Sequence, residues 1–452
     1  MKMSFHAERE NFMKRILSVI LSVFLLAGAA GCQRTSGEPS DRNDTREDVY
    51  LTRTNSKTVY GVEVPSALDE RLPGELVQLS ASADAAQQTP DNQPDEMRGV
   101  WLSYLNLDTM IKGQNEAQFT ANIDAAFQKI ADFGFNTVFA QVRPFGDAYY
   151  DSDYFPWSAR ITGTEGKNPG YDPLAVMCAA ADKYDLRIEA WLNPYRVRVS
   201  ATPEMASSNQ AKKWLNAGND AALSWNGGVY YNPGSADARK LIVNGVKEIV
   251  KNYDVDGIHF DDYFYPTSDL SFDRASYQKS GSKLGHADWR RENVNTLVRE
   301  VYAAVKELDP DCIFGISPQG NTKINYESQF ADVGKWLANP GYVDYILPQV
   351  YYGYQNDTCP YEETVAKWNG MIKTDGVRLY VGLAGYKVGV VDEWAGAGKN
   401  EWIGTTDLLA RMVKTARQNS HYGGIAVYSY DSLFGQGGAQ IEAECQNLQN
   451  LF

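Results

Sequence analysis

Eight short runs of β-branched and aromatic residues recur from Arg98 to the C-terminus, and each is followed by a longer stretch with helical periodicity. This alternation is typical of a parallel sheet whose strands are joined by crossover helices. Eight such strands are the number that closes the sheet into a (β/α)8 barrel. The predicted strands are 99–104, 137–142, 187–192, 257–260, 313–317, 345–349, 379–384 and 424–428.

The helices predicted between these strands use up the rest of the chain, so residues 96–452 are expected to form one α/β domain, a TIM barrel. A doubly wound open sheet would also alternate, but it would carry a glycine-rich phosphate loop after its first strand. The segment Ser103-Tyr104-Leu105-Asn106 is no such loop. The predicted helices are 121–133, 172–184, 235–253, 288–308, 332–339, 361–374, 405–419 and 439–450.

The N-terminus has the layout of a secretory signal peptide, which we expect over residues 1–32. Lys14 and Arg15 precede an apolar run, and small residues follow up to Cys32. The apolar run is short for a helix that spans a membrane, so export is expected. The polar residues before Met13 leave open whether Met1 or Met13 is the true start.

Cys32 is expected to carry a lipid. The preceding Ala29-Ala30-Gly31 resembles a bacterial lipobox, in which the thiol of the next cysteine is lipidated, although Ala29 stands where Leu is usual. Simple secretion is the alternative. Residues 33–95 are rich in Ser, Thr, Asp, Gln and Pro, which predicts a flexible tether. The barrel would then be held on the outer side of the bacterial cytoplasmic membrane or elsewhere in the cell envelope.

Charge and aromatic content restrict the partners of the chain. A net charge of −14 argues against nucleic acid, because phosphate binding needs a basic surface. The 10 Trp and 28 Tyr exceed what a core usually needs, and flat rings suit the faces of sugars.

The histidines and cysteines show no metal-ligand spacing, so neither a metal nor a cofactor is expected. The oligomeric state stays open, as does a disulfide between Cys312 and Cys359.

The segment 255–266, V-D-G-I-H-F-D-D-Y-F-Y-P, is the strongest candidate for the catalytic strand end. Active sites of such barrels lie on the loops that follow the strands. Strand alternation places His259 and Asp261 on one side, with Phe260 and Asp262 on the other until the strand ends. An isolated Asp at a strand end is usually a turn former or a cap. Here the rich context favours Asp261 as a nucleophile or charge stabiliser in glycoside hydrolysis.

Glycoside hydrolysis also needs a proton donor, and several carboxylates compete for that role. Asp262 is one candidate, although it would only cap or pair if it faced the helices. Asp147, after the second strand, and Asp431, after the eighth, are the others. Glu189 lies within the third strand, where it could instead be a buried polar residue of the barrel.

Residues that follow the strands are the candidates for binding the sugar. Gln349 and Tyr351 offer an amide and a phenol on one side of the sixth strand, which suits sugar hydroxyls or an N-acetyl group. The arginines could instead hold loops together, and Trp191 could fill the barrel. The complete set is Arg143, Trp191, Asn193, Arg196, His259, Tyr263, Gln349 and Tyr351.

An ordered set of motifs resembles the glycosyl hydrolase-like 10 family over nearly everything from Glu96 to the C-terminus. The resemblance implies a (β/α)8 barrel, commonly on a bacterial lipoprotein, with glycosidase activity toward peptidoglycan glycan strands that lack their peptides. It does not imply a settled catalytic pair. The motifs are M-R-G-V-W-L-S-Y, F-N-T-V-F-A-Q-V-R-P-F-G-D-A-Y-Y, P-W-S-A-R-I-T-G, P-G-Y-D-P-L, A-W-L-N-P-Y-R, V-D-G-I-H-F-D-D-Y-F-Y-P, W-R-R-E-N-V-N, F-G-I-S-P and V-D-Y-I-L-P-Q-V-Y.

Two wider resemblances bear on the mechanism. The fourth strand is similar to that of alpha-amylase-like and alpha-galactosidase-like barrels, where a basic residue stands two before the nucleophilic Asp, as His259 does before Asp261. It also resembles the D-G-x-D-x-D-x-E strand of family 18 chitinases, but Tyr263 stands where the acidic Glu would be. That departure leaves one alternative function, a catalytically inactive, lipid-anchored carbohydrate-binding barrel.

Overall fold

The computed structural model describes residues 96–435 and 437–452. The predicted signal peptide, the lipidation site Cys32, the tether over 33–95 and the choice between Met1 and Met13 lie outside these residues. Within the described part of the chain, no helix is both long and apolar enough to cross a bilayer.

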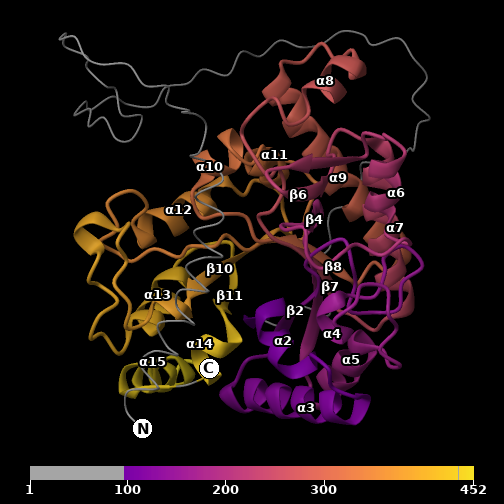
Figure 1. The fold of residues 1–452 in the computed structure, drawn as a ribbon. Coiled ribbons are helices and arrows are strands. Elements are labelled where there is room, and N and C mark those ends of the chain that lie inside the picture. The colour runs from indigo at the N-terminus through magenta and orange to yellow at the C-terminus, as the bar shows by residue number, and fades with distance from the viewer. Residues whose placement is uncertain (1–95, 436) are drawn as a thin grey trace, which may run out of the picture. The chain divides into compact units, whose positions relative to one another are not determined.

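Eight parallel strands close into a barrel, as the sequence predicts (Figure 1). Each strand pairs with the next one of the barrel along the chain, and the last pairs with the first, with Met97 opposite Gly424. The strands are β1 (Met97–Leu102), β2 (Thr137–Arg143), β3 (Arg187–Leu192), β7 (Gly257–Phe260), β8 (Ile313–Ile316), β9 (Tyr345–Ile346), β10 (Arg378–Ala384) and β11 (Tyr422–Tyr428).

The sixth strand of the barrel, β9, is shorter than predicted. Its regular pairing ends at Ile346, and Gln349 then makes only isolated bridges, to Gln319 and Gly382. Pro348 lies between these two segments and has no N–H to donate to a ladder, so the strand is interrupted there. Gln349 is nevertheless held at the same end of the barrel as its neighbours.

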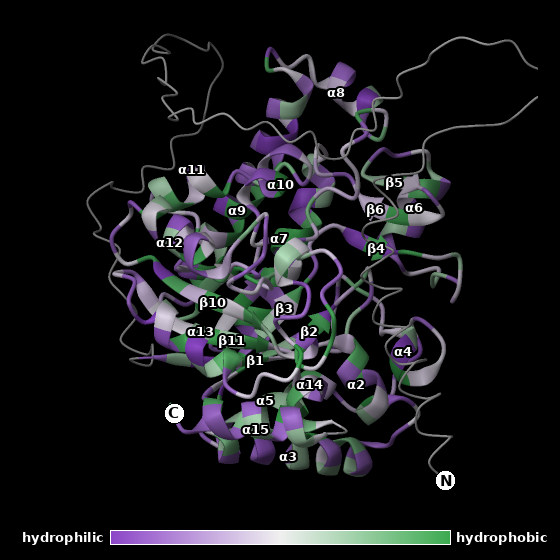
Figure 2. Ribbon diagram, turned by 90° about the vertical axis from the view of Figure 1, so that its left-hand side faces the viewer, coloured by the Kyte–Doolittle hydropathy of each residue, from purple (hydrophilic) through white to green (hydrophobic). Residues whose placement is uncertain are grey.

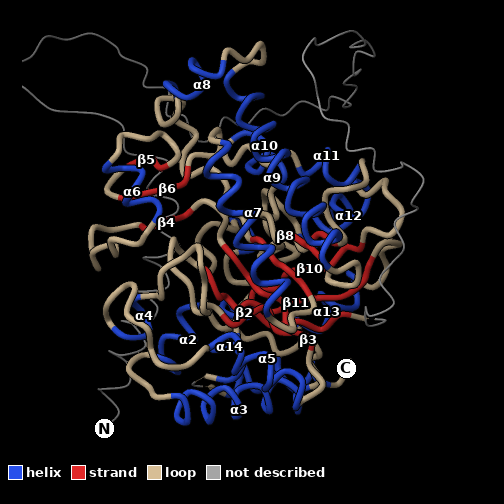
Figure 3. Tube along the Cα trace, turned by 90° about the vertical axis from the view of Figure 1, so that its right-hand side faces the viewer, coloured by secondary structure: helices blue, strands red, loops and turns tan. Residues whose placement is uncertain are grey.

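Eight helices cover the barrel at the predicted places, and Figure 3 shows the strands enclosed by them. Several begin at side-chain caps; Asp172, for example, accepts hydrogen bonds from the N–H groups of Leu174 and Ala175. Hydrophobic and hydrophilic residues alternate around these helices, as expected where one face packs on a sheet (Figure 2). The helices are α3 (Glu116–Phe133), α5 (Pro173–Lys183), α7 (Ala236–Asn252), α9 (His286–Leu308), α11 (Val333–Ala338), α12 (Tyr361–Met371), α13 (Leu408–Ala416) and α15 (Ala439–Gln449).

Shorter elements, which the sequence pattern did not predict, lie in the loops that follow the strands. The long loop after β3 folds into a small antiparallel sheet of order β4-β6-β5. Strands of three or four residues are too short to show periodicity. These elements are α2 (Tyr104–Ile111), α4 (Ala159–Thr162), β4 (Arg196–Arg198), α6 (Gln210–Asn216), β5 (Ala222–Trp225), β6 (Gly228–Tyr231), α8 (Arg274–Ser280), α10 (Thr322–Glu327), η1 (Gly385–Lys387), η2 (Gly396–Gly398) and α14 (Tyr430–Phe434).

The barrel interior is a packed layer of large side chains separate from the layer between sheet and helices. Inward residues, among them Trp101, Phe139, Trp191 and Tyr345, form a hydrophobic cluster of their own. Gly315 makes this possible, because a Cβ there would lie 1.9 Å from the Tyr345 ring. The interior is therefore filled, and chemistry is confined to the end where the strands finish, which we call the barrel mouth.

Candidate active site

Asp261 follows β7 directly and is held in place by three hydrogen-bond donors. Its Oδ2 accepts from Trp191 Nε1 at 3.2 Å and from Asn193 Nδ2 at 2.5 Å, and its Oδ1 accepts from the backbone N–H of Tyr263 at 3.1 Å. The residue is 2% exposed. Because β3 and β7 pair in parallel, with Trp191 opposite His259, their ends meet at the barrel mouth. The carboxylate is thus fixed in one orientation.

A chain of amides from three strand ends sets the orientation of Asn193. The backbone N–H of Tyr104 donates to Gln141 Oε1 at 2.9 Å, and Gln141 Nε2 donates to Asn193 Oδ1 at 2.7 Å. A backbone N–H can only donate, so Gln141 must present its oxygen to Tyr104 and its NH₂ group to Asn193. Asn193 is left with its own NH₂ group directed at Asp261. Tyr104 was not among the predicted site residues.

Asp262 lies at the barrel mouth too, because the strand, and with it the regular alternation of side chains, ends before this residue. Regular β7 ends at Phe260, whose ring packs outward on Phe314 at 5.1 Å. Beyond that point the alternation stops. Asp262 is 8% exposed, and its carboxylate accepts from Gln349 Nε2 and Gln329 Nε2, each at 3.3 Å.

Gln319 also donates a hydrogen bond to Asp262. Gln319 and Gln329 follow β8 and were missed, because nothing in the sequence around them signals a site. The barrel topology brings them to Asp262, since β8 lies between β7 and β9. Asp261 is thus hydrogen-bonded to residues at the end of β3, and Asp262 is hydrogen-bonded to residues that follow β8 and β9.

The two carboxyl groups share a buried, like-charged environment. Burial and the neighbouring Asp262 raise the pKa of Asp261 to about 7, against the opposing effect of Arg196, and burial also raises the pKa of Asp262. Around Asp261 the donors include an indole N–H and a backbone N–H, which can only donate and so favour a carboxylate. Asp262 likewise accepts from the amides of Gln319, Gln329 and Gln349, and Gln349 Nε2 also donates to the carbonyl of Ser317 at 3.0 Å. The two carboxyl groups therefore titrate as a pair.

The pair predicts a pH profile for any reaction that uses one ionised and one protonated carboxyl. The pKa of Asp261 is raised above its ordinary value of 3.8 to about 7, so the pair loses its last proton near neutral pH. We expect kcat/KM to fall as the pH rises through about 7 and, at lower pH, to fall again once both groups are protonated. A profile that stays flat from pH 5 to pH 9 would contradict this arrangement.

His259 lies one layer below this pair and is fully buried. The prediction that it binds the substrate is therefore wrong, because a substrate cannot reach it. Trp101 Nε1 donates to its Nε2 at 3.3 Å, which leaves that nitrogen unprotonated, and Nδ1 is 2.7 Å from the Tyr345 hydroxyl. Tyr345 in turn donates to Glu189. Burial lowers the pKa of His259 to about 3 and raises that of Glu189 to about 8, so the layer is neutral at pH 7.

Arg196 and Tyr263 form one wall of the barrel mouth. The Arg196 guanidinium lies 4.3 Å from the centre of the Tyr263 ring and 4.7 Å from that of Phe145. Its Nε donates to the carbonyl of Pro144 at 3.0 Å, which anchors the side chain. Arg196 is close enough to Asp261 to favour its ionised form.

A cluster of three tyrosines forms another part of the wall. The rings of Tyr351, Tyr386 and Tyr428 lie 5.8 to 6.1 Å apart. Lys387 anchors the loop after β10 to this cluster, because its Nζ donates to the carbonyl of Tyr351 at 2.7 Å. Tyr386 was missed by the sequence analysis; its only signal was its place just after a predicted strand. Tyrosine rings beside a carboxylate pair suit the apolar faces and hydroxyls of a sugar.

Three other predicted residues are not brought into this centre. Asp147 is buried in the loop after β2, where its Oδ2 accepts from the N–H of Ala159 at 3.2 Å. Asp431 lies in α14 and accepts a hydrogen bond from Asn106. Arg143 is buried against the Phe155 ring at 4.6 Å.

The position of Arg143 has a backbone cause. The pairing of β2 with β3 shifts between Gln141 and Arg143, so that Arg143 pairs with the outward-facing Leu192. The irregularity therefore turns the arginine out of the barrel. Arg143 and Asp147 therefore make contacts within the loop that follows β2.

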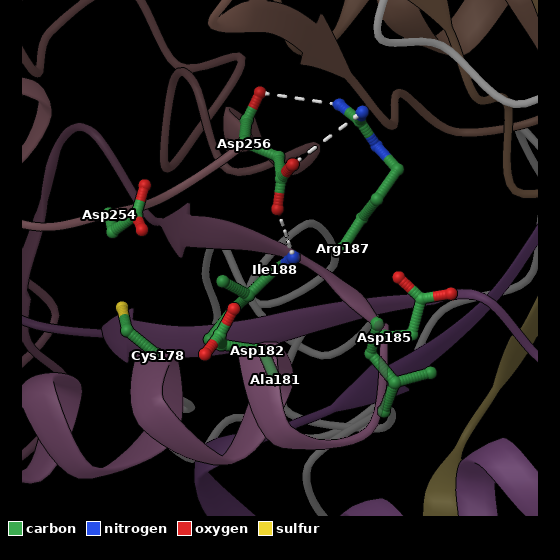
Figure 4. A pocket seen from close by; sticks show the side chains of 9 residues that line it. Cys178, Ala181, Asp182, Asp185, Arg187, Ile188, Asp254 and Asp256 are labelled. Carbon is green, nitrogen blue, oxygen red and sulfur yellow. Dashed lines mark hydrogen bonds and ion pairs between the residues drawn. The ribbon is translucent and has the colours of Figure 1, made fainter.

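A cavity of about 210 Å³ lies at the opposite end of the barrel, where the strands begin (Figure 4). Arg187 pairs there with Asp256 at 3.5 Å, and Asp256 accepts from the N–H of Ile188 at 2.7 Å. These contacts hold the start of two strands together, as residues of this end usually do. Among the residues that the structure describes, no group of three or more acidic, histidine or cysteine side chains could hold a metal ion.

The four described cysteines are free thiols, so the disulfide that was left open between Cys312 and Cys359 is not formed. Cys312 is buried, as expected for a small core residue, whereas the other three are partly exposed. Burial raises the pKa of Cys178, which lines the cavity of Figure 4, to about 12. It is held as an unreactive thiol at neutral pH.

Comparisons with known proteins agree with this architecture. The sequence model of the family described as Glycosyl hydrolase-like 10 matches residues 96–396. The chain is 37% identical to "Glycosyl hydrolase YngK" of Bacillus subtilis (strain 168) over 65% of this chain and 61% of that protein. It is 33% identical to "Glycosyl hydrolase DigH" of Escherichia coli (strain K12) over 69% of this chain and 77% of that protein.

Among solved structures, the glycoside hydrolase domain of PgaB (BpsB) from Bordetella bronchiseptica has a similar fold. Its TM-score is 0.52 at 14% sequence identity, and the match covers 78% of this chain and 99% of that domain. At this identity the likeness shows the barrel fold alone. The chain spans less than two thirds of the length of the Bacillus subtilis relative and about three quarters of that of the Escherichia coli relative.

Proposed function

The chain belongs to the glycosyl hydrolase-like 10 family, and we propose from this premise that it hydrolyses O-glycosidic bonds of a bacterial cell-envelope glycan, namely peptidoglycan strands that lack their peptides. The observation that carries the proposal is Asp261, a buried carboxylate held by three donors at the carboxyl end of a barrel strand. Two relatives are named as glycosyl hydrolases, which supports the reaction class.

The chemistry follows from the two carboxyl groups. Cleavage of a glycosidic bond develops positive charge at the anomeric carbon and negative charge on the leaving oxygen. In the state of the pair that cleaves the bond, Asp261 is ionised and stabilises the first charge. Asp262 carries the one proton of the pair in that state and donates it to the leaving oxygen. Because both groups are buried, they act in an environment where charges interact strongly.

The wall of the barrel mouth supports a glycan as the substrate. Tyr351 and Tyr428 are partly exposed, and both rings contact that of Tyr386, so that they can lie against sugar faces. Gln349 adds amide groups for sugar hydroxyls. Placement in the envelope, through export and a lipid on Cys32, is part of the same proposal and rests on the N-terminal sequence.

The test is to incubate the purified protein with peptidoglycan strands from which an amidase has removed the peptides, and to measure new reducing ends and fragment masses. We expect release from these strands and much less from the same strands with peptides attached. Cellulose serves as a β-linked control without N-acetyl groups. Binding to the strands without release of reducing ends would instead support the carbohydrate-binding alternative. If the protein neither bound nor cleaved the strands, both functions would be contradicted.

A further inference from the structure

Trp394 is the one tryptophan of the chain that is largely exposed. It lies in the loop between β10 and α13 and is 80% exposed, more than any other large hydrophobic residue that the structure describes; Val199 follows at 54%. Leaving an indole ring in water is unfavourable, because burial of its large apolar surface would stabilise the fold. The same loop buries a second indole, that of Trp402, to 1% exposure. The loop can therefore bury a tryptophan, yet it presents Trp394 to the solvent.

A series of contacts ties the backbone of Trp394 to the wall of the barrel mouth. Lys387 Nζ donates to the carbonyl of Tyr351 at 2.7 Å and to Asp392 Oδ2 at 2.6 Å. The other oxygen of Asp392 accepts from the backbone N–H of Trp394 at 3.4 Å. The Lys387–Asp392 pair is largely buried, with side chains 16% and 5% exposed. Trp394 is thus held at the rim of the barrel mouth, on the side of the tyrosine cluster.

The rest of the loop is fixed against the segment that follows β9. The Glu401 carboxylate accepts from the N–H groups of Tyr354 and Gln355, each at 2.9 Å. The N–H of Asp357 donates to the carbonyl of Ala395, the residue after the exposed tryptophan, at 3.2 Å. The indole is therefore carried by a loop that is already ordered, and binding to such a loop costs less conformational entropy than binding to a mobile one.

The charges at this rim favour a sugar over an anionic surface. Proteins that bind membranes through aromatic residues usually place Lys and Arg beside them. Here Glu393 precedes Trp394 and Asp357 lies beside the residue that follows it, and both acidic side chains are exposed. Lys399 is exposed on the same loop, so the rim keeps a net negative charge. Sugar hydroxyls can donate to such carboxylates while the apolar face of the sugar ring lies on the indole.

We propose that Trp394 is a sugar-binding platform outside the cleavage site, and that it makes the chain prefer long glycan strands. This inference rests on the proposed glycosidase function and adds a specificity-determining residue to it. A strand whose cleaved bond lies at Asp261 and Asp262 continues past the tyrosine cluster to Trp394. A fragment that ends before the rim does not gain this contact. Trp394 therefore strengthens the binding of long strands and leaves the chemistry at the cleaved bond unchanged.

The test compares Trp394→Ala with the parent on peptide-free strands that have been separated by length. For long strands we expect KM to rise about tenfold, the equivalent of about 1.4 kcal/mol, while kcat stays the same. KM for the shortest fragments that the parent cleaves should change far less, because they do not reach the indole. Trp394→Tyr keeps an aromatic ring and should recover part of the loss. The matched control is Leu308→Ala, which removes an exposed apolar side chain at the end of α9, before β8 begins.

The outcomes separate this inference from the proposed function. If Trp394→Ala left KM unchanged for every strand, or raised it equally for long strands and short fragments, the inference would be wrong and glycosidase activity would still stand. If the parent cleaved no strands, the proposed function would be wrong, and calorimetric titration with long strands would test Trp394 by itself. Weaker binding by Trp394→Ala would support the platform, whereas equal binding or none would contradict it. Binding of the parent but not of Trp394→Ala to phosphatidylglycerol vesicles, without a difference on strands, would assign the indole to a membrane instead.

Discussion

Replacing Asp261 by Asn is expected to remove nearly all turnover of peptide-free glycan strands while the barrel stays folded. The Asn side chain has the same shape and keeps one oxygen for the donors around it, but it cannot carry the charge that balances the anomeric centre. Loss of one fixed electrostatic contact to a transition state lowers kcat by about 10²- to 10³-fold, or about 3 to 4 kcal/mol.

The folded state of this variant should be nearly as stable as that of the parent. One of the three N–H groups loses its acceptor, which costs about 1 to 3 kcal/mol, but repulsion from Asp262 is removed at the same time. Circular dichroism and denaturant titration check folding, and reducing-end release checks activity. Asp124→Asn on α3, which loses a partly exposed pair with Lys183, is the matched control. Full activity of Asp261→Asn would overturn the assignment of this carboxylate under any glycosidase mechanism.

Replacing Arg290 by Met should cause a large loss of stability. Arg290 and Asp273 form an ion pair at 2.6 Å in which both side chains are fully buried. Arg290 also donates to the carbonyl groups of Thr267 and Asp269, so it holds the loop that follows Asp261 and Asp262. Without Arg290, the buried Asp273 carboxylate keeps its contact with His286 Nε2 at 2.8 Å but loses its main counter-charge, and removing one partner of such a pair costs about 3 to 5 kcal/mol.

The free energy of unfolding, measured by denaturant titration, tests this expectation. The double variant Arg290→Met with Asp273→Leu should recover much of the loss, because the isolated charge is then gone. The surface variant Arg411→Met, which breaks the exposed pair with Asp407, should change the free energy of unfolding by less than about 1 kcal/mol. A loss below about 1 kcal/mol for Arg290→Met would mean that the loop does not depend on this pair.

The strands and helices of the barrel could be predicted because their signals are local. All eight strands and all eight covering helices lie where apolar runs and helical periodicity placed them. The one marked difference, the short β9, also has a local cause in Pro348. The elements that escaped prediction, such as β4, β5 and β6, are too short to show a period.

The site residues could be predicted only in part, because their roles depend on contacts between distant segments. Asp261, Asn193 and Gln349 follow predicted strands, and the structure brings them to one end of the barrel. Gln329 and Tyr386 lie far from them in the sequence and carry no motif, so their part in the site was missed. His259 lies in sequence beside Asp261 but points into a closed layer below it.

The sequence by itself determined the closed barrel and the strand end that carries Asp261, because apolar periodicity and the residues that follow each strand are properties of neighbouring positions. Only the tertiary structure decided which carboxylates meet. Regular pairing stops at Phe260, which returns Asp262 to the barrel mouth, and a shift in the pairing of β2 turns Arg143 away. Both outcomes depend on the register between paired strands, which the residues near each position in the sequence do not determine.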